Sequence, residues 1–549
     1  MFNILLFGAL LVLFGSCKNT SKADLLVYNA KIYTVDSAFS VAEAMVVKDG
    51  KIVATGTSAE LQEKYDAKQK LDARGKFIYP GLIDAHAHFY RYGLGLRIVD
   101  LTGTTSWEDV LNRLGAAEKN FPPGAWLTGR GWDQNDWTDK EFPTKDLLDQ
   151  RFPNTPVLLT RVDGHAAIVN QKAIDLAGLR PGQTLVGGEV QVRNGQLTGI
   201  LIDNAVGLVA SKIPEAGNKE RQEALLDAQQ NCFAVGLTTV DDCGIDFPEV
   251  NLIDSLQKAN LLKMRLYVML SDDPRNYAFL EEKGIIKTDR LNVRSFKLYG
   301  DGALGSRGAC LLQPYSDKQG HYGFLLSPAS HFDSMAARIH KGGFQMCTHA
   351  IGDSANRTIL NTYAKYLKGK NDLRWRIEHA QVVSAADFNF FGQYSVIPSV
   401  QPTHATSDMY WAGQRLGAER EKGAYAFKQL MQQNGWIPLG TDFPVEDISP
   451  FKTFFAAVIR KDAQGTPAGG YQPENALSRQ DALRGMTIWA ARSNFEEKEK
   501  GSLEAGKFAD FIMLDQDLLS APEDRLLGIS VLQTWINGEK VYEKKGASR

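Results

Sequence analysis

The chain has 549 residues, of which 44% are hydrophobic and 23% charged, as in a globular protein long enough for more than one domain. Its 62 basic and 64 acidic residues nearly cancel, so they provide no basic surface for nucleic acid. Nucleic acid is therefore excluded as an expected partner.

The first 17 residues have the pattern of an export signal. Residues 2–14 are almost entirely apolar and are followed by Gly15-Ser16-Cys17 and a polar stretch. The run is shorter than the roughly 20 residues that span a bilayer and matches the core of a secretory signal. The small residues before Cys17 resemble a bacterial lipobox. We therefore expect a signal peptide at 1–17, lipidation of Cys17 and a linker at 18–23.

This signal predicts an exported protein, either periplasmic or attached to a bacterial membrane through the lipid on Cys17. Two features depart from a lipobox signal, because Phe14 stands where Leu is usual and no Lys or Arg precedes the apolar run. A plain cleaved signal and an uncleaved anchor therefore remain alternatives.

Both ends of the remaining chain predict short strands separated by turns. These segments are rich in β-forming residues, and Asp49-Gly50 and Asn537-Gly538 mark hairpins between some of them. The predicted strands are 24–28, 31–35, 44–47, 51–56, 509–514, 531–536 and 540–542. Neither end alone would bury enough apolar surface to be stable. We therefore expect 24–79 and 501–545 to combine into one small β-sandwich.

Between these ends, residues 80–500 alternate short apolar strands with helical stretches. Counting the strand that enters this region, the predicted strands are 77–88, 237–241, 264–269, 293–298, 344–349, 374–379, 396–401 and 437–442. This pattern predicts an α/β fold, the (β/α)8 TIM barrel, whose active sites lie at the C-terminal ends of the strands. The extra length falls in 89–214, which we expect to be an insertion over the barrel mouth that sets substrate specificity.

Two histidines, His86 and His88, end the first predicted barrel strand. Residues i and i+2 of a strand project from the same face, so both imidazoles would point the same way. At the end of an inward-facing strand they could bind one metal ion through neutral ring nitrogens.

Further polar residues lie on or after the later strands. His349, His379 and Asp442 end the fifth, sixth and eighth, and Lys297 lies inside the fourth. A buried lysine is costly unless it is paired or chemically changed, for example by carboxylation to an anionic carbamate. Each residue alone has a structural explanation. Their joint placement at the strand ends predicts a metal centre.

These motifs resemble those of the amidohydrolase superfamily, and within it family 3, the YtcJ-like group that includes N-substituted formamide deformylase. The likeness covers roughly residues 24–545. The segments that carry it are 81–88, 296–307, 349–353, 376–381, 399–402, 440–445 and 501–510.

The resemblance implies two divalent ions, expected to be zinc. His86, His88 and Asp442 would hold one ion, His349 and His379 the other, and carboxylated Lys297 would bridge them. Asp442 would act as general base and acid in hydrolysis of a non-peptide C–N bond of a small-molecule substrate, such as an N-substituted amide or formamide.

Four residues are candidates for substrate contact. By the resemblance, Asp133 and His165 lie in pocket loops of the insertion, with structural turns as the alternative. Arg307 could bind a substrate carboxylate, since guanidinium suits that geometry, or it could fix its own loop through an ion pair. His404, after the seventh strand, is expected to approach the substrate.

Three other functions remain open. A mononuclear, deaminase-like site would use the histidines and Asp442 without Lys297, and the binuclear centre could also hydrolyse esters or lactones. A non-catalytic binding lipoprotein is the third alternative. The oligomeric state is also open, with a homodimer as one option.

Overall fold

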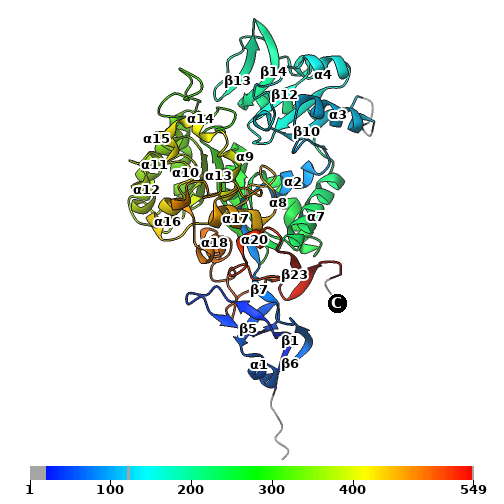
Figure 1. Cartoon of the computed structure of the whole chain (residues 1–549), viewed down its shortest axis with the longest axis vertical. Helices are drawn as coiled ribbons and strands as arrows, with labels where there is room; N and C mark the ends of the chain where they lie inside the picture. Colours follow the sequence, from blue (N-terminus) through cyan, green and yellow to red (C-terminus); the bar gives the residue numbers. More distant parts are fainter. Residues whose placement is uncertain (1–19, 120, 122–123, 547–549) are drawn as a thin grey trace, which may run out of the picture.

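The computed structural model describes residues 20–119, 121 and 124–546 (Figure 1). The predicted signal peptide and the lipidation site at Cys17 lie outside these residues. Within the described part of the chain, no helix is both long and apolar enough to cross a membrane.

Seven parallel strands form most of a barrel in the middle of the molecule (Figure 1). In chain order they are β8 (Leu82–Ala87), β15 (Leu237–Ile245), β16 (Arg265–Ser271), β18 (Leu291–Tyr299), β19 (Gln345–Ala350), β20 (Arg376–His379) and β21 (Ile397–Ser399). Each pairs in parallel with its neighbours, and a short strand, β17 (Ile286–Lys287), is added antiparallel to β18.

Residues 437–442 take the eighth position and close the barrel without forming a regular strand. A parallel bridge joins Leu439 to Val400, beyond β21. On the other side, the backbone N–H of Ala85 donates to Leu439 at 3.2 Å, and that of Asp442 donates to His86 at 2.8 Å. All eight predicted strand segments thus take part in the TIM-barrel-like α/β fold.

Helices alternate with the strands and pack their apolar faces onto the barrel. They include α7 (Asn218–Ala234), α8 (Phe247–Lys258), α9 (Pro274–Lys283), α10 (Ala329–Gly342), α11 (Asp353–Leu367), α12 (Phe388–Gln393) and α16 (Phe427–Asn434). In α10 the buried residues are Phe332, Ala336 and Ile339, a spacing that places them on one helix face. Such faces bury the outer surface of the sheet and fix the positions of the strand ends.

The first predicted barrel strand, 77–88, is divided in the structure. Its first part is β7 (Phe77–Pro80), which belongs to a different sheet, and only β8 lies in the barrel. The break is at Gly81, where an added Cβ would lie 2.3 Å from Oγ1 of Thr238. The prediction of one continuous strand was therefore wrong, because the chain leaves one sheet and enters another at this glycine.

The two chain ends meet in one sheet below the barrel (Figure 1). Its strands run in the order β24 (Glu539–Glu543), β23 (Val531–Ile536), β22 (Phe511–Leu514), β7, β2 (Lys31–Tyr33) and β3 (Val41–Ala42). A second sheet contains β5 (Lys51–Gly56), β4 (Ala44–Lys48), β1 (Ser21–Tyr28) and β6 (Tyr65–Asp72). One apolar cluster, which includes Val47, Ile78 and Trp535, joins the two sheets.

The segment between β8 and α7 forms a further sheet at the opposite end of the molecule (Figure 1). Its strands are β13 (Gly188–Arg193), β14 (Gln196–Asp203), β12 (Ala166–Val169), β11 (Val157–Arg161), β10 (Leu127–Trp132) and β9 (Val99–Asp100). Helix α2 (Phe89–Gly95), at the start of this segment, packs on barrel helix α7, because Gly93 allows backbone contact near Ala224. The separate sheet therefore begins after α2.

Candidate metal centre

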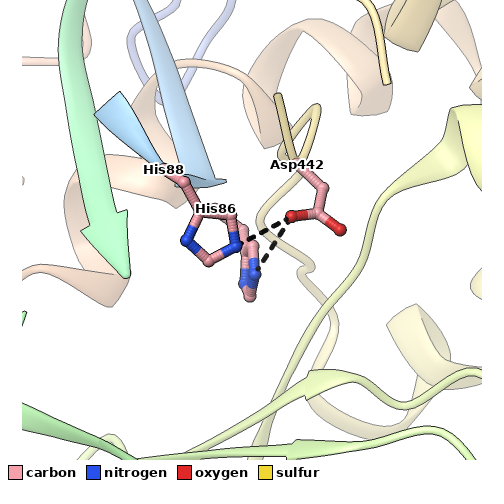
Figure 2. A group of neighbouring side chains, drawn as sticks. All are labelled: His86, His88 and Asp442. Atoms are coloured by element: carbon pink, nitrogen blue, oxygen red, sulfur yellow. Dashed lines mark ion pairs between the residues drawn. The ribbon is translucent and has the colours of Figure 1, made fainter. Parts of the chain in front are cut away.

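Three candidate ligands meet where β8 and the closing segment 437–442 end (Figure 2). Asp442 Oδ1 lies 3.6 Å from His86 Nε2 and 3.3 Å from His88 Nε2. The three ligand atoms all lie within 4.8 Å of one another. His88 is not in the strand but caps α2, and its ring still converges with that of His86 on the same carboxylate.

The second ring nitrogen of each histidine is held by a neighbour. His86 Nδ1 lies 2.5 Å from Glu378 Oε2, and His88 Nδ1 lies 2.8 Å from the carbonyl oxygen of Cys243. Such partners fix the tautomer and leave Nε2 free to bind a metal ion. Glu378 was not among the predicted site residues, although a buried glutamate directly before His379 is a signal that could have identified it.

The histidines His86, His88, His349 and His379 are held neutral and the aspartate ionised, whereas Asp442 and Glu446 raise the pKa of His404 well above its usual value against the effect of burial. Burial lowers the pKa of His88 to about 4, and burial together with neighbouring histidines lowers the pKa of His349 and His379 well below the usual value. Burial alone would raise the pKa of Asp442, but the neighbouring imidazoles, first those of His404 and His88, hold it well below its ordinary range. Neutral imidazoles and a carboxylate are the protonation states that bind divalent ions.

A second group of candidate ligands adjoins the first. The ring centroid of His379 lies 4.7 Å from that of His86 and 4.6 Å from that of His349. His404, at the start of α13 (Pro402–Asp408), places Nε2 3.0 Å from Asp442 Oδ2. Ligand atoms of His379, His404 and Asp442 lie within 4.8 Å of one another, so the geometry adds His404 to the predicted set.

Three buried polar atoms at the barrel mouth have no hydrogen-bond partner among the described residues: His349 Nε2, His379 Nδ1 and Asp442 Oδ1. We call these residues the mouth group. Leaving buried polar atoms unsatisfied costs about 1–3 kcal/mol each. A divalent ion would satisfy lone pairs of this kind, so the donor set fits a metal centre.

Lys297 lies on β18 beside these ligands and is fully buried. Its Nζ is 3.3 Å from His86 Nε2 and 5.2 Å from the ring of Tyr299, and it makes no ion pair with a described residue. The structure thus places a buried amine without a carboxylate partner next to the candidate ligands.

A cavity of about 750 Å³ opens over this centre. The inserted sheet forms part of its wall, so this segment is placed to contact a bound molecule. The polar residues that line the cavity from the barrel side include His88, Lys297, His349, His379, His404 and Asp442, and those from the inserted segment include Arg130, Asp133, Arg161, Asp163 and His165.

The other predicted contact residues divide into two sets. Asp133 is ion-paired with Arg161 at the cavity wall, and the His165 ring lies 5.0 Å from that of His349. Arg307 instead pairs with Asp317 at 2.9 Å and does not line the cavity. The loop-fixing alternative therefore describes Arg307, and the structure does not bring it to the site.

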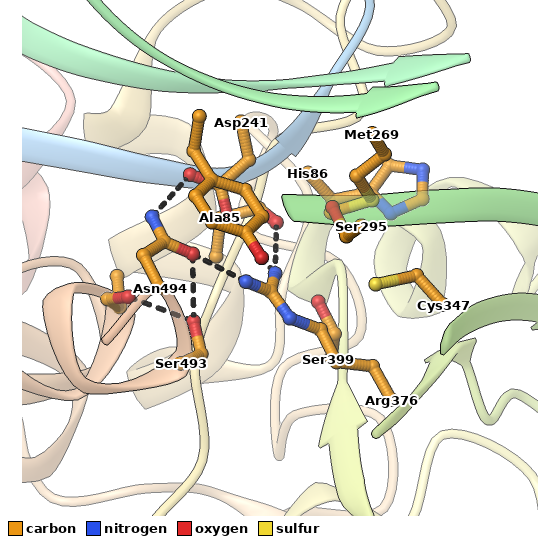
Figure 3. A network of polar contacts seen from close by, with 12 residues as sticks. Ala85, His86, Asp241, Met269, Ser295, Cys347, Arg376, Ser399, Ser493 and Asn494 are labelled. Carbon is orange, nitrogen blue, oxygen red and sulfur yellow. Dashed lines mark hydrogen bonds and ion pairs between the residues drawn. The ribbon is translucent and has the colours of Figure 1, made fainter. Parts of the chain in front are cut away.

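A buried network lies beneath the candidate ligands (Figure 3). Arg376 donates from Nη1 to Asp241 at 2.9 Å and to the carbonyl of Ala85 at 3.3 Å, and Asn494 donates to Asp241 at 2.6 Å. We call Arg376, Asp241 and Asn494 the floor network. It joins β8, β15 and β20, and therefore fixes the strands that carry His86 and His379.

Comparison with known proteins agrees with this geometry. Residues 69–542 match the amidohydrolase family. Protein LONG AFTER FAR-RED 3 of Arabidopsis thaliana is 34% identical, covering 95% of this chain and 92% of its own. The amidohydrolase YtcJ of Bacillus subtilis is 30% identical (93% and 98%), and N-substituted formamide deformylase of Arthrobacter pascens is 27% identical (96% and 100%).

A solved structure leads to the same assignment. A metal-dependent hydrolase of Pyrococcus horikoshii is 28% identical, with a TM-score of 0.75, over 91% of this chain and 99% of that one. Because the family match covers most of the sequence, this chain belongs to the amidohydrolase family, as a metal-dependent hydrolase.

Proposed function

We propose that the protein hydrolyses a non-peptide C–N bond, such as that of an N-substituted amide or formamide. The observation that carries this proposal is the mouth group, a set of buried and unsatisfied metal-ligand atoms facing a cavity large enough for a small molecule. The similarity to N-substituted formamide deformylase supports the choice of bond.

The chain offers ligands for two divalent ions, expected to be zinc. His86, His88 and Asp442 would hold one, and His349 and His379 would hold the other, with His404 close to both Asp442 and His379. When bound, such ions supply a nucleophile at neutral pH by lowering the pKa of water, and they polarise a carbonyl group.

Asp442 is the proposed proton carrier. As a buried carboxylate at the cavity wall, it would take the proton of the attacking water and pass it to the leaving amine. His404 contacts Oδ2 at 3.0 Å and is itself held by Glu446 at 3.2 Å, so these two side chains orient the carboxylate.

Lys297 is the proposed bridging residue. Its neutral amine would add to carbon dioxide, forming an N–C bond and releasing a proton to solvent, and the resulting carbamate is an anion with two oxygen ligands. Among the described residues this buried lysine has no ion-pair partner, which supports the proposal, because carboxylation would remove the cost of burying an unpaired ammonium.

The first test is metal analysis of protein purified without chelator, combined with a screen of N-formyl and N-acyl amines in the presence of bicarbonate. We expect about two ions per chain and release of the amine. About one ion would favour a mononuclear, deaminase-like site. No ion, with none taken up on reconstitution, would contradict the hydrolase proposal and favour a binding protein.

The bridge is tested with a matched pair of lysine variants. Lys297→Ala should lose metal and activity, whereas Lys258→Ala should retain both, since Lys258 is exposed and pairs with Asp254 at 2.6 Å, away from the cavity lining. A Lys297→Ala protein that kept two ions and the wild-type rate would rule out the carbamate bridge.

A further inference from the structure

Two arginines reach the cavity from neighbouring strands of the inserted sheet, and their surroundings differ. Arg161 on β11 is paired with Asp133 and, at 2.6 Å, with Asp163. Arg130 on β10 makes no ion pair with a described residue. Its one hydrogen bond runs from Nη2 to the carbonyl of Val162 at 2.9 Å, and its Nε is buried without a partner. One guanidinium of the cavity is therefore neutralised and the other is not.

The carboxylates near Arg130 do not neutralise its positive charge. Burial lowers its pKa, and the two carboxylates that raise it, Asp163 and Asp442, are already engaged by Arg161 and by the candidate metal centre. Asp100 and Asp136, which also line the cavity, are exposed to solvent. A partly buried cation of this kind is stabilised when a ligand brings the opposite charge.

A glycine lies beside the guanidinium of Arg130 and places no side chain against it. Gly164 has φ +74°, a conformation that favours glycine, and a Cβ there would lie 3.4 Å from Nη1 of Arg130. Among the described residues Nη1 has no hydrogen-bond partner, and Nη2 carries a second proton besides the one donated to Val162, so the edge formed by Nη1 and Nη2 has protons left for a ligand. That edge matches the two oxygens of a carboxylate.

We propose that Arg130 binds a carboxylate of the substrate, so that the enzyme acts on N-acyl or N-formyl amines that carry an acid group away from the scissile C–N bond. This inference rests on the proposed function. It assigns to Arg130 the contact that the sequence suggested for Arg307, which the structure places outside the cavity.

The experiment uses metal-loaded enzyme and matched pairs of N-formyl amino acids and their amides, which differ only in the charge of the carboxyl group. For at least one pair, we expect kcat/KM to favour the acid, and Arg130→Gln to lower the acid value by roughly 10- to 100-fold through loss of a charged hydrogen bond. The amide value should change little, so the preference should disappear.

Two further variants separate charge recognition from folding. Arg130→Lys keeps the charge and should retain part of the preference for the acid. Arg193→Gln, an exposed change on β13 of the same sheet, should retain all of it. If Arg130 only fixed Val162 and its loop, Arg130→Gln would lower acid and amide turnover equally, and the proposal would be overturned.

A binding measurement keeps this inference separate from the proposed function. The same acids should raise the melting temperature of the wild-type holoenzyme more than the amides do, and Arg130→Gln should abolish the difference. Stabilisation by acids without any hydrolysis would uphold Arg130 as the anion site and contradict the C–N hydrolase. Hydrolysis of amides as efficient as that of acids, with equal stabilisation by both, would contradict the anion site alone.

Discussion

The floor network and the mouth group lie in the same barrel, are both buried and contain charged or ionisable residues, yet they differ in how these are satisfied. At the floor, Arg376, Asp241 and Asn494 pair with one another through hydrogen bonds, and among the described residues only Nε of Arg376 is left without a partner in this network. At the mouth, His349 Nε2, His379 Nδ1 and Asp442 Oδ1 have no hydrogen-bond partner among the described residues.

This difference indicates that the floor network stabilises the fold and that the mouth group serves function. A paired buried charge fixes its neighbours, and breaking the pair leaves an uncompensated charge. Unsatisfied ligand atoms are instead available to bind a metal ion, which the chain itself does not supply. Changes at the floor should therefore act on folding, and changes at the mouth should act on metal binding and catalysis.

The largest effect is expected at the mouth, on activity. Asp442→Asn should lower kcat/KM by roughly 10²- to 10⁴-fold, because it removes the general base and weakens a metal ligand. The melting temperature of the chelator-treated protein should fall less than at the floor, because the amide oxygen of Asn can still take the place of Oδ2 beside His404. Steady-state kinetics and thermal unfolding measure the two effects, with Asp272→Asn, a carboxylate paired with His331 outside the centre, as the control.

The next effect is expected at the floor, on stability. Arg376→Met leaves Asp241 buried without its cation and should cost about 3–5 kcal/mol in the unfolding of the barrel, seen as a lower urea midpoint. Adding Asp241→Leu should recover part of the loss. An Arg376→Met protein with the wild-type midpoint would show that the floor network does not stabilise the barrel.

Metal removal should have an intermediate effect on stability. At a free metal concentration 100 times Kd, binding stabilises the folded state by about 2.7 kcal/mol, so a chelator should lower the melting temperature. Far-ultraviolet circular dichroism should remain that of a folded protein, since the floor network does not depend on metal. In His349→Asn the difference between metal-loaded and chelated protein should be smaller. An equal difference would place His349 outside the centre.

The smallest effect on stability is expected at Asp517, whose cationic partner Lys31 lies closer to solvent. Burial alone would raise the pKa of Asp517, but hydrogen bonds from Lys31, Tyr79 and Tyr33 lower it to about 2. Because the folded-state pKa lies below the unfolded value, this pair stabilises the protein above pH 4 and progressively less as the pH falls towards 2.

Asp517→Asn should therefore cost about 1–2 kcal/mol at neutral pH and less at pH 3. Lys31, the cationic partner, is 44% exposed, so solvent screening keeps the effect below that at the floor. Urea midpoints of the two proteins between pH 7 and pH 3 measure it. A constant difference across this range would show that the ionisation of Asp517 contributes nothing.

The barrel was largely predictable because its signals are local. Apolar runs mark the strand segments, and polar residues mark their ends, so His86, His349, His379 and Asp442 could be selected before their positions were known. The division of the first strand at Gly81 was missed. The apolar pattern continues through it, and the close approach of Thr238 that requires glycine comes from 157 residues later in the chain.

The sequence by itself determined the alternation of strands and helices and the residue types at the strand ends, because periodicity and turn chemistry act over a few residues. Only the tertiary structure decided which polar groups are paired. Arg376 meets Asp241 across 135 residues, Arg307 is engaged by Asp317, and Arg130 makes no ion pair within the described part of the chain. Such pairing depends on burial and distance, which arise only when segments remote in sequence pack together.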